Sequence, residues 1–170
     1  EIENAVGKLS GRKKMLIDPE RLSYALYKLI PDETEMIEKE NPEIIMKSVK
    51  NDIETEHIRR AHLKDAAAHT KFIYWLKENI GKTEITERSA SARLEEFRKE
   101  QDGYLGPSFE PISAYYEHGA IVHYSASKES DARLEKGHFL LTDTGGHYKD
   151  GSTDITRTVA LGEVSYQEKE

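Results

Sequence analysis

The apolar residues of this chain change their spacing partway along it, and that change limits the folds it can adopt. Between residues 52 and 80, apolar side chains recur on one stripe of a helix: Ile58, Ala61, Ala68, Phe72 and Leu76. Thr86 can cap a second helix. From residue 109 onward the spacing shortens to that of strands, at residues 112–116, 120–124, 138–142 and 154–159. This order predicts an α+β fold, with two helices packed on a mainly antiparallel sheet.

The first fifty residues follow another pattern, that of the end of an α/β domain. Residues 14–17 form an apolar strand, helical spacing continues to Pro31, and residues 34–37 indicate another strand. Asn41 and Pro42 begin a polar connection. We therefore assign residues 1–44 to the C-terminal part of one domain and residues 45–170 to the start of the next. Because the chain begins without Met, inside an amphipathic segment, we expect it to be a piece of a longer protein.

Composition excludes several classes of function. The 170 residues include 25 Lys and Arg against 32 Asp and Glu, and the net charge of −7 repels nucleic acid and anionic lipid. The chain has no Cys, so thiolate metal sites and disulfides are excluded. It also has no apolar run long enough to cross a bilayer. We expect a cytoplasmic protein with no nucleic-acid partner and no membrane partner.

Two carboxylates stand out between residues 140 and 159. In a strand, Asp143 shares a face with Phe139 and Leu141, which predicts that it points to the buried side. Asp154 shares a face with Thr156 and therefore projects into a polar place. A buried carboxylate needs a partner, and a divalent cation is one of the few that can hold two carboxylates together.

The sequence leaves the register between these carboxylates open. A two-residue turn at Asp150 and Gly151 would place Asp154 opposite His147 and not opposite Asp143. A bulge at the Gly145 and Gly146 pair would repair the offset. Both registers remain possible at this point.

The segment containing both carboxylates also carries a family resemblance. The string TDTGGHYKDGSTDITRT, residues 142–158, resembles the first metal-binding motif of the pita-bread metallopeptidases, in particular the three-domain cytosolic aminopeptidase P group. Residues 107–127 are similar to the segment of that family that carries an active-site His. Residues 16–27 and 41–50 resemble the end of its second, non-catalytic, creatinase-like domain and the entry to its catalytic domain.

The resemblance implies a fold, a site and an activity. Residues 45–170 would be the N-terminal half of a pita-bread (creatinase/aminopeptidase) catalytic domain. Asp143 and Asp154 match the first two metal ligands, and His123 matches a substrate-side catalytic His that is not a ligand. The implied cofactors are two divalent metal ions, and hard carboxylate oxygens favour Mn²⁺. The implied substrate is a peptide with proline in the second position, and a homodimer is expected.

The 170 residues depart from the family pattern because they do not contain its remaining ligands, one His and two Glu, which lie downstream of this motif. We therefore expect the 170 residues alone to be catalytically silent. Two alternatives to this interpretation are also open. One alternative is a prolidase-like enzyme that cuts Xaa-Pro dipeptides. The other is a non-catalytic pita-bread homologue that serves as a binding module.

Other polar residues receive plainer predictions. His57, His62 and His69 lack the four-residue spacing of a helical metal pair, so they are predicted on the helix surface. His118, His138 and His147 match no role. Trp75 and Phe72 are predicted in the core. Residues 93–100 are predicted as the solvated face of their helix, and Arg157 either braces a carboxylate or forms a surface ion pair.

Overall fold

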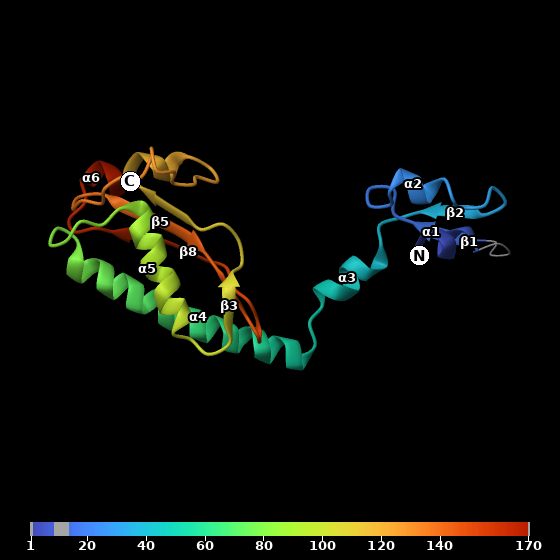
Figure 1. Cartoon of the computed structure of the whole chain (residues 1–170), viewed down its shortest axis with the longest axis horizontal. Coiled ribbons are helices and arrows are strands. Elements are labelled where there is room, and N and C mark those ends of the chain that lie inside the picture. The colour runs from blue at the N-terminus through green and yellow to red at the C-terminus, as the bar shows by residue number, and fades with distance from the viewer. Residues whose placement is uncertain (1, 9–13, 170) are drawn as a thin grey trace. The chain divides into compact units, whose positions relative to one another are not determined.

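The computed structural model describes residues 2–8 and 14–169 (Figure 1). The chain divides into two compact units, residues 1–51 and 52–170. The domain boundary predicted between residues 44 and 45 stays a prediction. Within the described part of the chain, no helix is both long enough and apolar enough to cross a membrane.

The first unit contains a small parallel sheet. Its elements are α1 (Ile2–Gly7), β1 (Lys14–Ile17), α2 (Tyr24–Tyr27), β2 (Glu35–Glu38) and α3 (Pro42–Ser48). Strand β1 pairs with β2 in parallel register, with Lys14 opposite Glu35. Parallel strands joined through a helix agree with the end of an α/β domain.

The helices of this unit differ from the sequence prediction in two places. Helix α2 covers only one turn, because the amides of Leu29 and Ile30 bond the carbonyls three residues earlier and the chain tightens into turns. The segment predicted as a polar connection forms α3 instead. Asn41 caps this helix by accepting a hydrogen bond from the Glu43 amide at 3.0 Å, and Pro42 occupies its first turn.

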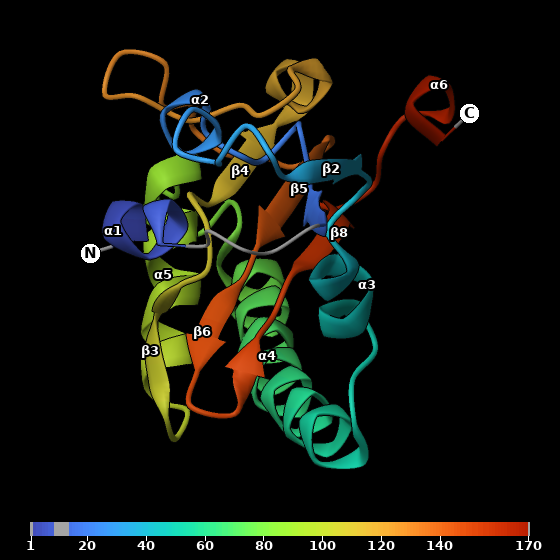
Figure 2. The same cartoon turned by 90° about the vertical axis from the view of Figure 1, so that its right-hand side faces the viewer.

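The second unit combines two long helices and shorter helical segments with two antiparallel sheets, arranged as Figure 2 shows. Its elements are α4 (Asp52–Asn79), α5 (Glu87–Lys99), β3 (Tyr104–Pro107), β4 (Ile112–Tyr115), the 3₁₀ helix η1 (Tyr116–Ala120), β5 (Phe139–Thr144), β6 (Gly146–Tyr148), β7 (Gly151–Ser152), β8 (Ile155–Ala160) and α6 (Tyr166–Lys169). One sheet has the order β3-β6-β7 and the other β4-β5-β8. Every pairing within them is antiparallel. The predicted α+β class is confirmed.

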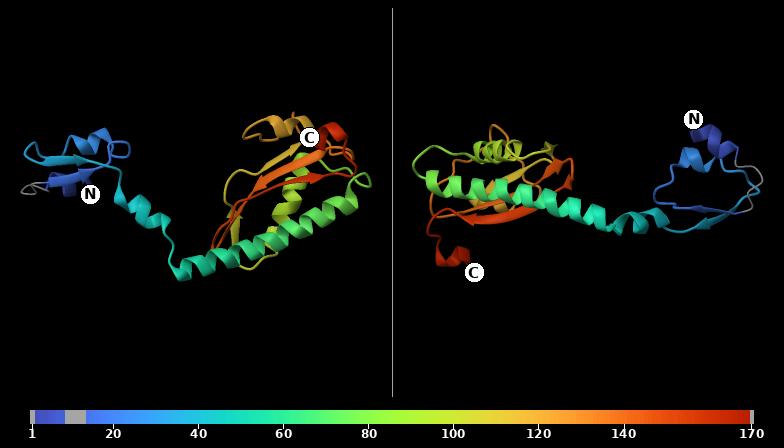
Figure 3. Two further views of the ribbon diagram at one scale, coloured as in Figure 1. Left: turned by 180° about the vertical axis from the view of Figure 1, so that it is seen from behind. Right: turned by 90° about the horizontal axis from the view of Figure 1, so that it is seen from below.

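The core of this unit lies between the helices and the β4-β5-β8 sheet (Figures 2 and 3). Helix α4 contributes Ala68, Phe72 and Leu76, and the predicted cap Thr86 starts α5 by accepting a hydrogen bond from the Ser89 amide at 3.2 Å. Phe72 is fully buried and Trp75 packs partly buried against it, so their prediction as core residues is confirmed.

Two local predictions for this unit are wrong. Residues 120–124 form no strand. Tyr116 and His123 have φ of 50° and 56°, which breaks an extended chain, and turn bonds join the Ile121 amide to the His118 carbonyl. The solvated face predicted for residues 93–100 is also wrong at Arg98, which is only 1% exposed.

We expect Phe72→Ala to lower the free energy of unfolding by about 3–5 kcal/mol, because it leaves a cavity between α4 and the sheet. The matched control is Tyr74→Ala on the opposite side of the same helix, where the side chain is 70% exposed. This control should change stability by roughly 0.5 kcal/mol or less. Urea unfolding measures both, and equal losses would contradict the assigned core.

Candidate functional site

Asp143 lies on the side of β5 that faces away from the helices. Along β5 the buried residues alternate with partly exposed ones, and the buried set is Leu140, Thr142 and Thr144. Thr144 bonds Arg98 of α5, so this buried set faces the helices. The prediction that Asp143 points to the buried side is therefore wrong. Threonines rather than the apolar Phe139 and Leu141 take the inner positions, because their hydroxyls find hydrogen-bond partners there.

The strand register brings the two predicted ligands to neighbouring positions. Asp143 lies directly opposite Thr156 of β8, whose hydroxyl donates a 2.7 Å hydrogen bond to Asp143 Oδ1. Asp154 precedes Thr156 by two residues. Because side chains alternate along extended chain, Asp154 and Thr156 are expected on the same side, diagonal to Asp143.

Neither register considered from the sequence is the one observed. Tyr148 pairs with Gly151, so the turn of the hairpin is formed by Lys149 and Asp150, one residue earlier than predicted. The pairing of Thr144 with Ile155 continues the same register. No bulge intervenes, and Asp154 falls opposite Gly145.

Both carboxylates keep oxygen atoms available. Within residues 2–8 and 14–169, Asp154 is exposed and forms no hydrogen bond or ion pair, and Asp143 forms only the bond from Thr156. Over the same residues, no group of three or more acidic or His side chains is placed to hold a metal ion. Asp143 and Asp154 are therefore two neighbouring carboxylates whose oxygens are largely free of protein partners in the described part of the chain.

A buried ion pair lies on the other side of this sheet. Arg98 of α5 donates from Nε to Asp65 Oδ1 at 2.6 Å and from Nη2 to Asp65 Oδ2 at 3.2 Å. Asp65, on α4, is 0% exposed. A buried charge destabilises a fold unless it is paired and hydrogen-bonded, and this bidentate geometry satisfies both groups.

Hydrogen bonds connect this ion pair to the residues beside both predicted ligands. Arg98 Nη2 also donates to Thr144 Oγ1 at 2.9 Å, and Thr144 follows Asp143. The Thr153 hydroxyl donates to Asp65 Oδ2, and Thr153 precedes Asp154. One buried pair therefore fixes both strands at the positions adjoining Asp143 and Asp154.

The glycine between the strands allows this close approach. A Cβ added at Gly145 would lie 2.0 Å from the Thr153 carbonyl oxygen and 2.3 Å from Ser108 Oγ. Neither atom can move easily, because Ser108 Oγ donates to that same carbonyl at 2.9 Å. Only glycine fits here, and this explains its place between the two predicted ligands.

His69 is a buried neighbour of this network, so its prediction as a helix-surface residue is wrong. It is 3% exposed, and its Nε2 lies 3.4 Å from the hydroxyl of Thr142. Burial, with a further contribution from the Arg98 charge, lowers the pKa of His69 to about 4. The imidazole is therefore neutral at physiological pH.

His123 lies apart from the two carboxylates in its contacts. It is exposed, follows η1 in a turn, and has a left-handed backbone with φ of 56°. Within the described residues it forms no hydrogen bond or ion pair, including none to Asp143 or Asp154. The register of β5 and β8 therefore places the two aspartates at neighbouring positions. Among the described residues, no hydrogen bond or ion pair connects His123 to either of them.

The remaining sequence predictions for polar residues have mixed outcomes. His118 bonds the buried Glu87 through Nδ1 at 2.8 Å, and His138 bonds Glu168 at 2.7 Å. Arg157 donates to the Thr156 carbonyl at 2.7 Å, and among the described residues it pairs with no carboxylate, so neither interpretation of it holds.

Sequence reasoning missed Asp65, Arg98 and Glu87, although a signal for two of them was present. Asp65 lies four residues after Ala61 and three before Ala68, on the apolar stripe of α4. Arg98 follows Leu94 by four residues on the buried side of α5. A charged residue on an apolar helix stripe predicts a buried partner.

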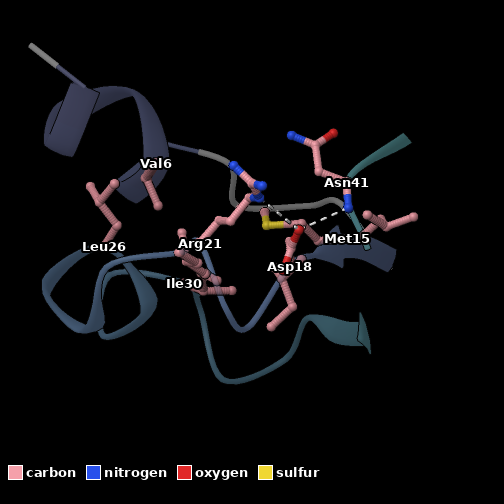
Figure 4. Close-up of a pocket in the computed structure, with 10 residues that line it drawn as sticks. Val6, Met15, Asp18, Arg21, Leu26, Ile30 and Asn41 are labelled. Carbon is pink, nitrogen blue, oxygen red and sulfur yellow. Dashed lines mark hydrogen bonds and ion pairs between the residues drawn. The ribbon is translucent and has the colours of Figure 1, made fainter. Parts of the chain in front are cut away.

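A cavity of about 310 Å³ lies within the first unit (Figure 4). Its lining is mostly aliphatic, with Asp18, Arg21 and Asn41 as the polar members. Asp18 Oδ2 accepts from the Asn41 amide at 2.9 Å and lies 3.8 Å from Arg21 Nε. The carboxylate therefore holds two chain segments together, and the cavity shows no catalytic arrangement.

Two family models together match nearly the whole chain. A model described as metallopeptidase family M24 matches residues 56–170, and one described as the creatinase/prolidase N-terminal domain matches residues 1–54. The chain is 41% identical over 161 residues to Xaa-Pro aminopeptidase 2 of Sus scrofa, covering 95% of this chain and 24% of that protein. The chain thus spans about a quarter of the length of that curated relative.

Solved structures show the same similarity. An X-prolyl aminopeptidase from Caenorhabditis elegans, described as a cytosolic enzyme with a di-nuclear active site, matches with TM-score 0.80 and 32% identity, over 89% of this chain and 25% of that one. A Xaa-Pro dipeptidase from Bacillus anthracis matches with TM-score 0.77 and 27% identity, over 99% and 46%. These similarities confirm the pita-bread fold that residues 142–158 predicted.

We expect Asp65→Asn to lower the free energy of unfolding by about 3–5 kcal/mol, because it leaves the Arg98 charge buried without its counterion. The control is Glu100→Gln, which breaks the exposed pair of Glu100 with Lys71 and should cost less than about 1 kcal/mol. Chemical denaturation distinguishes the two. Similar small losses would show that the buried pair does not organise this unit.

The lowered pKa of His69 predicts a pH dependence of stability. In the unfolded chain the imidazole takes up a proton near pH 6.5, whereas in the folded protein it does so only near pH 4. Stability from this residue is therefore complete above pH 6.5 and declines by about 3 kcal/mol as pH falls to about 4. Unfolding of His69→Gln between pH 7 and 4 should lack this decline, and parallel curves would refute the assignment.

Proposed function

This chain belongs to metallopeptidase family M24, and from that premise we propose that the protein containing it is a metal-dependent aminopeptidase. The proposed enzyme removes the N-terminal residue from peptides with proline in the second position. The observation that carries the proposal is the register of β5 and β8, which sets Asp143 opposite Thr156 and so beside Asp154.

The chemistry of the donor set fits divalent metal ions. Asp143 and Asp154 offer hard carboxylate oxygens that the described residues leave largely unengaged. Such oxygens suit Mn²⁺, and we propose that Asp143 and Asp154 would help to hold a centre of two such ions. Further ligands must come from the rest of the protein. When bound, a pair of divalent ions polarises the scissile carbonyl and lowers the pKa of a bound water.

The residues of this chain would bind the metal ions, orient the metal ligands and stabilise the negative charge that develops on the substrate. Asp143 and Asp154 hold the metal ions, and the Thr156 hydroxyl orients Asp143 through its 2.7 Å hydrogen bond. Asp65 and Arg98 fix the neighbouring Thr144 and Thr153, which keeps the two carboxylates at a constant separation. His123, on its exposed loop, would donate a hydrogen bond to the oxygen that becomes negative during attack.

Substrate preference is part of the proposal. A prolidase-like dipeptidase is the second candidate, since a dipeptidase of known structure shares the fold. Among solved structures, the identity is 32% to an X-prolyl aminopeptidase and 27% to that dipeptidase, which favours the aminopeptidase. A non-catalytic homologue is less favoured, because Asp143, Asp154 and His123 are all present.

Further properties are proposed at the level of the whole protein. We propose that residues 1–44 belong to the second, non-catalytic domain and that residues 45–170 begin the catalytic one. The description of the Caenorhabditis elegans relative as cytosolic supports a cytoplasmic location. A homodimer remains a proposal.

We expect Asp154→Asn in the full-length protein to lower hydrolysis of Arg-Pro-Pro in Mn²⁺ by at least about 100-fold, because an amide replaces a charged metal ligand. Bound manganese, measured by atomic emission, should fall as well. The control is Asp150→Asn in the same hairpin, whose carboxylate bonds Lys64 Nζ at 2.6 Å instead.

Two results would count against the proposal. Undiminished cleavage by Asp154→Asn would remove this residue from the metal centre. If the unsubstituted enzyme cleaved Gly-Pro faster than Arg-Pro-Pro, the prolidase alternative would replace the aminopeptidase.

A further inference from the structure

Glu87 is a buried carboxylate that the proposed reaction does not use. It is the first residue of α5 and is 0% exposed. Its Oε1 accepts from the Tyr115 amide at 2.7 Å and from His118 Nδ1 at 2.8 Å. Its Oε2 accepts from the Tyr124 hydroxyl at 2.8 Å and the Ala132 amide at 3.1 Å. A carboxylate this deeply buried is stable only because each oxygen has two donors.

These donors all belong to one excursion of the chain, residues 115–132. Tyr115 ends β4, His118 lies in η1, Tyr124 lies in the following turn, and Ala132 is where the chain returns to α5. The His118 ring also stacks on the Tyr124 ring, with centroids 4.5 Å apart. Glu87 therefore joins the start, the middle and the end of the excursion.

The first turn of α5 reinforces the return point. The Glu87 amide donates to the Ala132 carbonyl at 3.0 Å, and the Arg88 amide donates to Asp131 Oδ1 at 3.0 Å. The partial positive charge at the start of this 13-residue helix also favours the carboxylate of Glu87. The excursion is thus attached to a rigid element and not to another loop.

His123 lies at the exposed part of this excursion, immediately before Tyr124. Tyr116 and His123 are the two residues other than glycine with positive φ in the described chain, and both fall between the attachment points of Glu87. Such backbone conformations persist where the surroundings hold them. Along the chain, the hydrogen-bonded side chain nearest to His123 is that of the next residue, Tyr124, whose hydroxyl bonds Glu87 and Ser130.

We propose that Glu87 is a positioning residue that sets the location of the His123 imidazole through Tyr124 and His118. This inference rests on the role for His123 in the proposed function. Glu87 itself does not touch substrate. Its effect is to keep His123 in one conformation, so that the imidazole does not have to be ordered during each turnover.

The test is a double-mutant cycle in the full-length enzyme, with Arg-Pro-Pro as substrate and Mn²⁺ present. Tyr124→Phe removes one hydroxyl and keeps the ring, and it should lower kcat about tenfold with KM changed by less than about twofold. Glu87→Gln should lower kcat further, by about 100-fold, because its amide nitrogen cannot accept from two donors. In a His123→Ala background, neither substitution should reduce kcat further.

Tyr104→Phe is the matched control. It also removes a tyrosine hydroxyl that bonds a glutamate of α5, at 2.5 Å from Glu95 Oε2, outside the His123 excursion. It should leave kcat and KM unchanged. Melting temperature and bound manganese are measured for every variant. If Glu87→Gln does not fold, Tyr124→Phe alone completes the cycle.

Each outcome is decisive. If Tyr124→Phe lowers kcat by the same factor with and without His123, Glu87 and Tyr124 do not act through His123 and the inference is wrong. If Tyr124→Phe has no effect in the unsubstituted enzyme, it is also wrong. If His123→Ala leaves kcat unchanged, the role of His123 fails too, whereas the metal proposal is still judged separately by Asp154→Asn.

Discussion

The ion pair between Asp65 and Arg98 joins α4, α5 and the hairpin that follows β5, and the arrangement of the candidate metal site depends on it. Both charges lie in the interior, where solvation is lost, and the pair is stable because the Thr144 and Thr153 hydroxyls add further hydrogen bonds. These hydroxyls belong to neighbours of Asp143 and Asp154. A structural interaction on one side of the sheet therefore fixes the spacing of groups on the other side.

The strands separate structural and chemical roles by their two faces. On β5, Thr142 and Thr144 face inward and bond His69 and Arg98, whereas Asp143 between them faces outward. Inward hydroxyls satisfy buried donors without carrying charge, which leaves the outward positions to carboxylates that a metal ion can use. Glu87 has a comparable structural role for residues 115–132. Its buried carboxylate accepts hydrogen bonds from this loop, which also carries the exposed His123.

Periodicity was enough to predict α4, α5 and most strands, because their apolar stripes and alternation are long enough to recognise, whereas α3 was missed and α2 was predicted too long. The sequence could not reveal the left-handed turn at His123, since residues 120–124 have strand-like composition and the attachment to Glu87 is 37 residues distant for Tyr124. The hairpin register was missed by one residue, because Lys149 rather than Gly151 enters the turn. The face of Asp143 was misassigned because the apolar Phe139 and Leu141, which share its face, were given more weight than Thr142 and Thr144, which take the buried positions.

The claim that Asp143 and Asp154 share a metal centre is tested most directly by anomalous diffraction from crystals of the full-length protein grown with Mn²⁺. The account predicts manganese peaks contacted by both carboxylates, on the face of β5 and β8 opposite Arg98. Peaks bound elsewhere, or aspartates on opposite faces of an ordered sheet, would contradict it.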